Sequence, residues 1–192
     1  MGTKEKLINA TVDIFSKKGY SMTLKDVAQK VNIKVPSIYN HFDSKDDIIY
    51  TSIKEELKRQ HNYFISFFNS LEDKPSKVIL KEIFFSIIDK FESKDIVFFW
   101  KSIDSIDNLE LKNKCQSLMS KNTNHFSNKL DKVFKKGYKN NTIKKKNIKG
   151  QKTLYLSMIY GIITDILITE SYTIDDDLKN EVWITFWQGI KA

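Results

Sequence analysis

The segment from Thr23 to Lys45, TLKDVAQKVNIKVPSIYNHFDSK, constrains the fold more than any other part of the chain. Thr23 is a favourable N-cap residue, and Asp26 stands three residues later as its capping-box partner. Pro36 suits the first turn of a second short helix, which the pattern ends near Phe42. Two short helices separated by a three-residue corner predict a helix-turn-helix, the arrangement that places a helix in the major groove of DNA.

Longer helical patterns flank this motif on both sides. Apolar side chains recur at helical spacing over residues 3–18, and Gly19 follows where a helix can end in the left-handed conformation. Ser44 is an N-cap residue for a helix that the pattern extends to about Leu71. We therefore predict a three-helix domain at residues 1–47 that continues without a flexible linker into the rest of the chain.

Residues 48–192 show helical patterns only. Apolar stripes recur at helical spacing through this region, and two prolines and six glycines leave little room for a turn-rich β architecture. We predict an all-α protein of about nine helices, with a helix-turn-helix DNA-binding domain at residues 1–47 and a helical body at residues 48–192.

The helix predicted at about residues 148–172 is apolar nearly all round its middle, so it must be buried on all sides. Helices near the end of a chain of this size have few neighbours, and Gly161 would let two backbones approach closely. We predict that the last two helices pack against a second copy in a twofold interface, which would suit paired helix-turn-helix units. The alternative is a well-filled core within one chain. The predicted interface residues are Tyr155, Ile159, Ile162, Ile166, Trp183, Phe186 and Trp187.

The net charge of +8 is distributed unevenly along the chain. Residues 1–47 carry eight lysines and six acidic residues, whereas residues 129–152 carry ten lysines and one acidic residue. Charge is therefore weak evidence for DNA binding by the head, and the motif carries that prediction. We interpret the basic stretch Lys135–Lys152 as a solvated connection between helices.

The single cysteine, Cys115, excludes an internal disulfide and fits a reducing compartment. The first ten residues contain no apolar run of signal-peptide type. The most apolar segment, residues 154–168, is too short to span a bilayer and contains Asp165. We therefore expect a cytoplasmic protein with no membrane partner.

Residues 6–50 resemble the TetR family of bacterial transcriptional regulators. The resemblance rests on an amphipathic first helix, FSKKGY, the segment TLKDVAQKVNIKVPSIYNHF and DSKDDII, and beyond residue 50 only helix layout and length agree. It implies a homodimeric regulator, a repressor, whose body at residues 48–192 binds a small effector and forms the dimer. Effector binding would move the long fourth helix and change the spacing of the two heads on a palindromic or near-palindromic operator.

The resemblance also implies which head residues contact DNA. Hydroxyl groups, ammonium groups and backbone N–H groups hold phosphates, and side chains on the second helix of the motif can reach base edges. Alternatively, Tyr39 is an ordinary surface tyrosine, and His41 lies only at the edge of the groove. The implied phosphate contacts are Thr23, Tyr39 and Lys45, and the implied groove-facing residues are Lys25, Val35, Pro36, Ser37, Asn40 and His41. Lys34 departs from the family pattern, which often has a small capping hydroxyl residue there, and could add a phosphate contact at some cost in capping.

Aromatic residues are numerous in the body and could line a cavity for an apolar or aromatic effector, or could fill a plain core. The candidate pocket residues are Phe64, Phe67, Phe68, Phe84, Phe98, Phe99, Trp100 and Phe126.

Motifs that carry catalytic chemistry are missing from the sequence. It has no Gly-rich phosphate loop, zinc-protease motif or nucleophile elbow. His61, Cys115 and His125 lack the spacing of metal ligands. We therefore expect no metal, no cofactor and no enzymatic activity. The alternative function from another class is a helical dimerisation or adaptor protein with a degenerate DNA-binding head.

Overall fold

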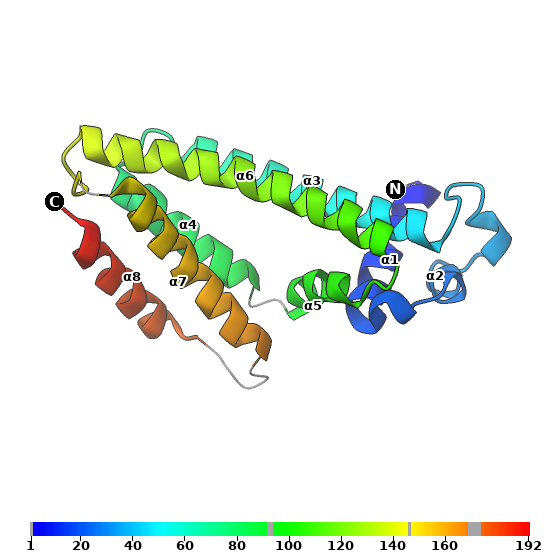
Figure 1. Cartoon of the computed structure of the whole chain (residues 1–192). Coiled ribbons are helices and arrows are strands. Elements are labelled where there is room, and N and C mark those ends of the chain that lie inside the picture. The colour runs from blue at the N-terminus through cyan, green and yellow to red at the C-terminus, as the bar shows by residue number, and fades with distance from the viewer. Residues whose placement is uncertain (1, 92–93, 146, 169–173) are drawn as a thin grey trace. The chain divides into compact units, whose positions relative to one another are not determined.

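The computed structural model describes residues 2–91, 94–145, 147–168 and 174–192 (Figure 1). Within these ranges the chain is helical, and the only strand-like pairing is one isolated bridge between Ile143 and Lys191. The all-α prediction is therefore confirmed. No helix in the described ranges is both long and apolar enough to cross a membrane. The α-helices are α1 (Thr3–Lys18), α2 (Leu24–Lys30), α3 (Lys45–Ser70), α4 (Ser76–Phe91), α5 (Lys94–Ser102), α6 (Leu109–Lys139), α7 (Ile148–Ile168) and α8 (Asp176–Ile190).

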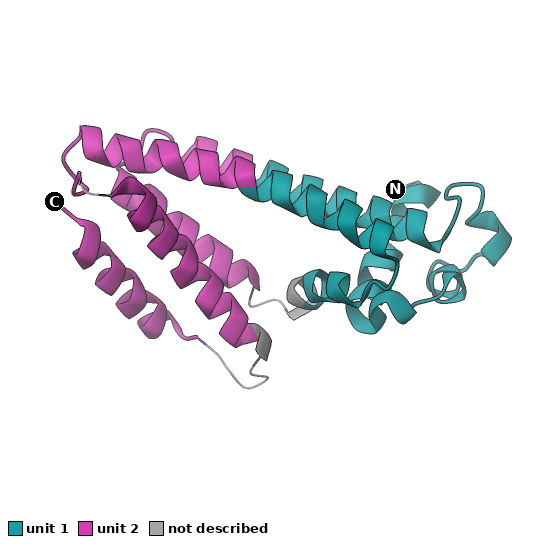
Figure 2. Cartoon of the chain, in the orientation of Figure 1, with its two compact units in different colours: residues 1–63, 95–123 teal, residues 64–94, 124–192 magenta. Residues whose placement is uncertain are grey.

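The chain packs into two compact units (Figure 2). Unit 1 comprises residues 1–63 and 95–123, and unit 2 comprises residues 64–94 and 124–192. Helices α3 and α6 each begin in unit 1 and end in unit 2. These units are defined by packing, and the functional boundary near residue 47 stays a prediction.

The core of unit 1 forms where the apolar faces of the first three α-helices meet those of α5 and α6. Leu7 and Phe15 of α1 are fully or almost fully buried, as is Val27 of α2. Phe99 of α5 packs edge-on against Phe15, with ring centroids 5.7 Å apart. Ile38 and Phe42 join this core, as predicted; their burial anchors the second part of the helix-turn-helix. The same cluster contains Ile49, Ile53, Ile103, Leu111 and Cys115.

The core of unit 2 is aromatic and aliphatic. Tyr155 of α7 is completely buried, and its hydroxyl donates a hydrogen bond to the backbone oxygen of Leu80 in α4 at 2.7 Å. Trp183 and Trp187 of α8 stack with centroids 5.9 Å apart, and Phe84 of α4 lies against Trp183. The α4, α7 and α8 helices therefore share one core, which also includes the second half of α6.

The predicted count of nine helices requires correction, because the described ranges contain eight α-helices. The missing helix is the one predicted from Val35 to Phe42. Only Val35–Ser37 form a 3₁₀ turn (η2), and turns follow. Its hydrogen bonds are mostly of the i to i+3 type, including Ile38 N to Val35 O at 2.9 Å and His41 N to Ile38 O at 2.9 Å. Lys34 supplies no side-chain cap, and β-branched residues lower helix propensity, so this short segment stays in the tighter geometry.

The sequence pattern also predicts that Thr173, with Asp176 three residues later, caps the last helix. Thr173 lies outside the described residues, as does the predicted end of the preceding helix at Tyr172. Helix α8 is instead capped by Asp175, whose Oδ1 accepts a hydrogen bond from the backbone N of Leu178 at 2.8 Å.

Candidate nucleic-acid interface

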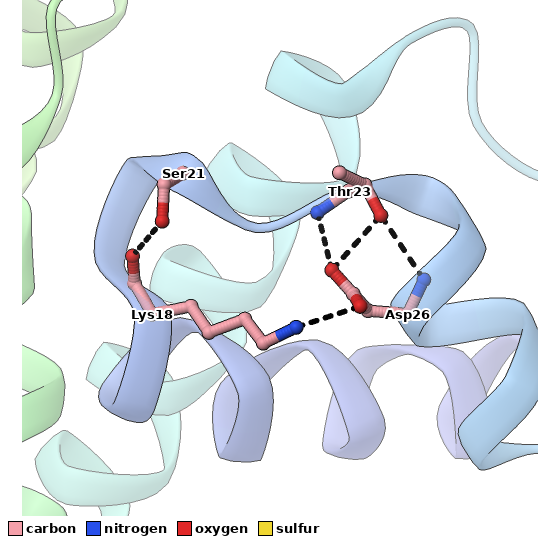
Figure 3. A network of polar contacts seen from close by, with 4 residues as sticks. All are labelled: Lys18, Ser21, Thr23 and Asp26. Atoms are coloured by element: carbon pink, nitrogen blue, oxygen red, sulfur yellow. Dashed lines mark hydrogen bonds and ion pairs between the residues drawn. The ribbon is translucent and has the colours of Figure 1, made fainter.

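The first helix of the motif starts at a complete capping box (Figure 3). Asp26 N donates to Thr23 Oγ1 at 3.2 Å, and Thr23 N donates to Asp26 Oδ2 at 2.8 Å. The ammonium of Lys18 lies 2.7 Å from the other carboxylate oxygen of Asp26. Hydrogen bonds from Lys18 and from Thr23 lower the pKa of Asp26 to about 2. The predicted capping box is thus confirmed, and it connects the end of α1 to the start of α2.

The corner of the motif falls at Asn32, as predicted. Asn32 has a φ of 56°, in the left-handed region that asparagine tolerates better than most residues. The next residue, Ile33, donates its backbone N–H to Ala28 O at 2.9 Å, which closes the end of α2. The chain therefore turns sharply after α2 and enters the 3₁₀ turn η2.

The second part of the motif separates buried from exposed side chains. Ile38 and Phe42 are 0% and 3% exposed, whereas Tyr39 is 55% exposed, and Asn40 and His41 are also exposed. The two buried side chains anchor this segment in the core, and the three polar side chains on its other side are exposed to solvent. The backbone here forms a short turn and not a regular helix. Among the other predicted contacts, Thr23, Lys25, Lys34 and Pro36 are exposed, and Val35 and Ser37 are partly buried.

Lys45, like Thr23, is a predicted DNA contact whose side chain is already engaged within unit 1. Its ammonium donates a hydrogen bond to the backbone oxygen of Tyr20 at 2.8 Å and lies 3.8 Å from the centroid of the Tyr20 ring. A phosphate contact by Lys45 would therefore require this side chain to leave Tyr20 or to share its charge.

Tyr20 belongs to a polar cluster that we call the Tyr20 junction, made of Tyr20, Asp46, Ser105 and Asn108. The Tyr20 hydroxyl donates to Asp46 Oδ1 at 2.8 Å, and Asn108 Nδ2 donates to Asp46 Oδ2 at 2.8 Å. Ser105 Oγ accepts from the backbone N of Tyr20 at 2.9 Å. The hydrogen bond to Asp46, together with partial burial, raises the pKa of Tyr20 to about 12. The junction joins the segment after α1, the first turn of α3 and the segment before α6.

Sequence reasoning missed this junction because its members are distant along the chain. Tyr20 and Asp46 are 26 residues apart, and Asp46 and Asn108 are 62 residues apart. One local signal was available in Asn108, a good N-cap residue directly before α6, whose Oδ1 accepts from Leu111 N at 3.2 Å. That signal predicts the start of α6 but not its connection to the head.

The predicted effector-pocket residues fall in both units. Phe98, Phe99 and Trp100 belong to unit 1, and Phe99 is 2% exposed in the core against Phe15. In unit 2, Phe126 lies against Phe64 and Phe68, with centroids 5.4 and 5.7 Å apart. The remaining two, Phe67 and Phe84, are in unit 2, partly and fully buried. A role for any of them in effector binding stays a prediction.

The predicted dimer-interface residues lie mainly in the core of a single chain. Tyr155, Ile159, Ile162, Trp183, Phe186 and Trp187 are at most 9% exposed, and Ile166 is partly buried. These side chains pack against α4 and α6, which agrees with the alternative of a well-filled single-chain core. A role for them in dimerisation stays a prediction.

The residues weighed as metal ligands are not gathered. His61 Nδ1 lies 3.2 Å from Asn122 Oδ1, and Cys115 is fully buried, where desolvation raises the pKa of its thiol to about 11. In the part of the chain that the structure describes, no group of three or more His, Cys, Asp or Glu residues could hold a metal ion.

This all-α chain thus has a helix-turn-helix head. It consists of a capped helix, a left-handed corner and an exposed polar turn, which is anchored by the buried side chains of Ile38 and Phe42. Residues 7–50 match the family model described as bacterial regulatory proteins, tetR family. The head of this chain is therefore similar to the DNA-binding heads of that family.

The curated relatives match only part of the chain. The biofilm operon icaADBC HTH-type negative transcriptional regulator IcaR of Staphylococcus epidermidis is 42% identical over 65 residues, which is 33% of this chain and 33% of that protein. IcaR of Staphylococcus aureus (strain Newman) is 50% identical over 52 residues, which is 27% of this chain and 28% of that protein. The aligned part thus spans about a third of these relatives or less.

Solved structures match the fold over nearly the whole chain. A TetR-family regulator from Mesorhizobium loti has a TM-score of 0.79 at 13% identity, covering 98% of this chain and 96% of the other. FadR from Bacillus subtilis, solved in complex with stearoyl-CoA, has a TM-score of 0.70 at 20% identity, covering 97% and 98%. A regulator from Saccharomonospora viridis in complex with choline has a TM-score of 0.79 at 15% identity, covering 98% and 97%.

Proposed function

We propose that this protein is a sequence-specific DNA-binding transcriptional regulator that acts as a homodimeric repressor. The observation that carries the proposal is the exposed polar group Tyr39, Asn40 and His41, held on the buried pair Ile38 and Phe42. The match of residues 7–50 to the tetR family and the similarity to negative regulators named IcaR support it.

The head would bind DNA through positioned groups more than through net charge. Tyr39 and Lys34 would donate to phosphates, together with the free backbone N–H groups at the start of α2. The hydroxyl of Thr23 also donates to Asp26 at 2.9 Å, so a phosphate would have to compete with that carboxylate. Groove contacts would come from Lys25, Val35, Pro36, Ser37, Asn40 and His41.

The dimer would form through the exposed side of the last two helices. Leu154 and Tyr160 of α7 are 55% and 51% exposed, and Ile184 of α8 is 53% exposed. A Cβ added at Gly161 would meet nothing within 4 Å, so α7 has an open position where a second backbone could approach. Exposed apolar side chains beside such open positions favour close packing of helix against helix.

The effector would be a small apolar or aromatic molecule bound in the helical body. The partly buried ring cluster of Phe64 and Phe126, together with the buried Phe68, supports an apolar site. FadR of Bacillus subtilis and the Saccharomonospora viridis regulator were solved with stearoyl-CoA and with choline, so proteins of this fold accept chemically different ligands. Because linkage is reciprocal, an effector that weakens operator binding must itself bind more weakly when operator is present.

Fluorescence anisotropy with a labelled duplex from upstream of the gene, compared with a random duplex, tests the proposal. We expect the upstream duplex to bind at least about 10³-fold more tightly at physiological salt. Tyr39→Ala should weaken binding to both duplexes and flatten the salt dependence. Asn40→Ala should reduce the preference by about 1–3 kcal/mol for one lost base contact.

Lys101→Ala, at an exposed position of α5, is the matched control and should change neither quantity. Equal affinity for the upstream and random duplexes, with no effect of either head substitution, would contradict the proposal. That result would favour the helical adaptor with a degenerate head.

A further inference from the structure

Six exposed lysines lie at one end of unit 2, and we call them the basic rim. Lys132, Lys135 and Lys139 are in α6, Lys144 and Lys145 are in the connection after it, and Lys149 is in the first turn of α7. The end of α6 and the start of α7 lie close together in Figure 1. We propose that the basic rim is a second DNA-contact surface, which binds the phosphate backbone of duplex DNA without regard to sequence.

The positive charge of the rim is not neutralised locally. The only acidic residue between residues 129 and 152 is Asp131, and Lys152 already occupies it at 2.7 Å. Among the described residues, no carboxylate lies within ion-pair distance of any rim ammonium. Two exposed acidic residues, Glu72 and Asp73, lie in the connection between α3 and α4, directly before Lys74 in the sequence. Their two negative charges leave most of the positive charge of the rim uncompensated.

Local structure does not explain these lysines. Lys132, Lys135 and Lys139 are spaced three and four residues apart on one face of α6, where like charges repel. Lys149 stands at the start of α7, where the helix dipole favours negative groups. An external anion would turn both of these unfavourable arrangements into favourable ones.

The backbone that carries the rim is ordered by its own hydrogen bonds. Thr142 N donates to Gly137 O at 2.9 Å, and Lys144 N donates to Ile190 O at 2.9 Å. Between them, Ile143 is completely buried, packed over Gly137, where a Cβ would clash with it. Gly150 N donates to Asn147 Oδ1 at 3.1 Å at the start of α7. The rim is therefore a preformed surface, and binding would not have to order its backbone.

The side chains around the rim favour duplex DNA over other polyanions. Proteins that bind single-stranded nucleic acids stack the bases on exposed aromatic side chains. The aromatic residues next to the rim lysines of α6, Phe134 and Tyr138, are buried. Stable attachment to an anionic membrane usually needs an apolar or lipid anchor besides the charges, and the exposed apolar residue at the rim is Ile148, at 37%. Lysine ammonium groups without base-reading partners suit phosphates spaced along a duplex.

Binding of a random-sequence duplex by the full chain across a salt titration tests this proposal. The rim variant carries K135E, K139E, K144E and K149E. The control variant carries K54E, K58E, K101E and K121E, at exposed positions of unit 1, so both variants have the same net charge. We expect the rim variant to lose about tenfold or more in affinity at low salt and to reduce the slope of log K against log salt by about 3.

The control variant should retain a slope close to that of the natural protein. A variant with glutamine at the four rim positions should show a smaller loss in the same direction, and far-UV circular dichroism should show that all variants fold. Equal slopes for the rim and control variants would overturn the proposal. Rim-dependent binding to phosphatidylserine vesicles, with duplex binding unchanged, would also overturn it and would assign the surface to membranes.

The rim proposal and the proposed function fail in different measurements. The function of the head is tested by the preference for the upstream duplex over the random one, which the rim substitutions should leave unchanged. In a Y39A background, the random duplex should still bind through the rim, and the four rim substitutions should remove most of that remaining affinity. Residual binding that is insensitive to these substitutions would contradict the rim proposal alone.

Discussion

Units 1 and 2 are both helical, but different interactions hold them together. In unit 1 two carboxylates collect several hydrogen bonds: Asp26 at the start of α2 accepts them from nearby residues, and Asp46 in the first turn of α3 accepts them from distant segments. In unit 2 the main contacts are aromatic and aliphatic, such as the stacked Trp183 and Trp187. The buried ammonium of Lys179, 2.8 Å from Asp89, is a polar exception.

This difference fits the functions that we propose: DNA binding by the head in unit 1, and dimerisation through the last two helices in unit 2. Hydrogen bonds are directional, so they fix the orientation of short segments such as the start of α2 and the first turn of α3. Apolar burial is not directional and supplies stability roughly in proportion to buried area. We therefore expect core substitutions in unit 2 to reduce stability most, and substitutions at the polar ties of unit 1 to affect mainly local order and DNA binding.

The largest effect should come from Phe84→Ala in unit 2. Phe84 is completely buried and packs against Phe85 and Trp183, so its removal leaves a cavity. We expect a loss of about 3–5 kcal/mol in the free energy of unfolding, measured by urea denaturation. Glu82→Ala, at an exposed position of α4 in the same unit, should change it by less than about 0.5 kcal/mol. Similar losses for the two variants would contradict the assignment of Phe84 to a packed core.

Gly19→Ala should have the next largest effect, and it acts on unit 1. Gly19 has a φ of 56°, and an added Cβ would lie 2.5 Å from Ser105 Oγ, next to the Tyr20 junction. We expect a loss of about 1–3 kcal/mol, because a positive φ is strained for alanine and the junction must shift. The control is Gly189→Ala in α8, where a Cβ meets nothing within 4 Å.

Thermal unfolding of the two glycine variants, with amide hydrogen exchange, would measure this difference. Gly189→Ala should be neutral or stabilising by about 0.5–1 kcal/mol, since alanine is the better helix residue. Faster exchange confined to the segments around Tyr20 and Ser105 is expected for Gly19→Ala alone. A neutral Gly19→Ala would show that the close approach to Ser105 is unimportant.

Removal of one hydroxyl from each unit gives a more closely matched comparison. Tyr155→Phe deletes the buried hydrogen bond to Leu80 O, with an expected loss of about 1 kcal/mol. Tyr20→Phe deletes the hydrogen bond to Asp46, which is more accessible to water, and should cost less global stability while increasing exchange in the first turn of α3. A larger global loss for Tyr20→Phe than for Tyr155→Phe would reverse the comparison.

Tyr20 should also affect stability at alkaline pH. Its pKa is about 12 in the folded chain and 10.0 for an ordinary tyrosine, so the folded state keeps the proton to higher pH. The associated stability is present below pH 10 and is lost as the pH rises towards 12. Tyr20→Phe should remove this part of the alkaline decline in urea denaturation experiments.

The smallest effect should come from the pH dependence at Asp26. Its pKa is lowered to about 2 from 3.8, so the unfolded chain binds more protons between these values, and stability falls as the pH drops through them. Asp26→Asn should give a shallower acid decline in urea denaturation between pH 2 and pH 4, together with a weaker α2 cap. An unchanged acid profile would mean that Asp26 has a similar pKa in the unfolded chain.

Local rules predicted most of the head correctly. The capping box at Thr23, the corner at Asn32 and the burial of Ile38 and Phe42 follow from residues within a few positions of each other. The 3₁₀ geometry after Pro36 was missed because the sequence pattern of one helical turn is similar for both helix types.

Long-range contacts were not predictable in the same way. The Tyr20 junction depends on segments that meet only in the folded chain, and no local pattern marks it. The apolar character of α7 predicted burial all round its middle, but within one chain α7 is buried on one side and exposed at Leu154 and Tyr160. The pattern could not tell whether a neighbouring helix or a second copy covers each side. Exposure at Leu154 and Tyr160, and burial at Tyr155 and Ile159, came only from the packing of α4 and α8.

The single thiol of Cys115 lies in the core of unit 1, completely buried and with a raised pKa. At neutral pH a thiol-specific reagent can therefore modify it only when that core opens. The labelling rate therefore measures how often the core of unit 1 opens, because unit 2 contributes no thiol of its own. Slower labelling in the presence of a duplex would show, without any label on the DNA, how far binding of that duplex keeps the core of unit 1 closed.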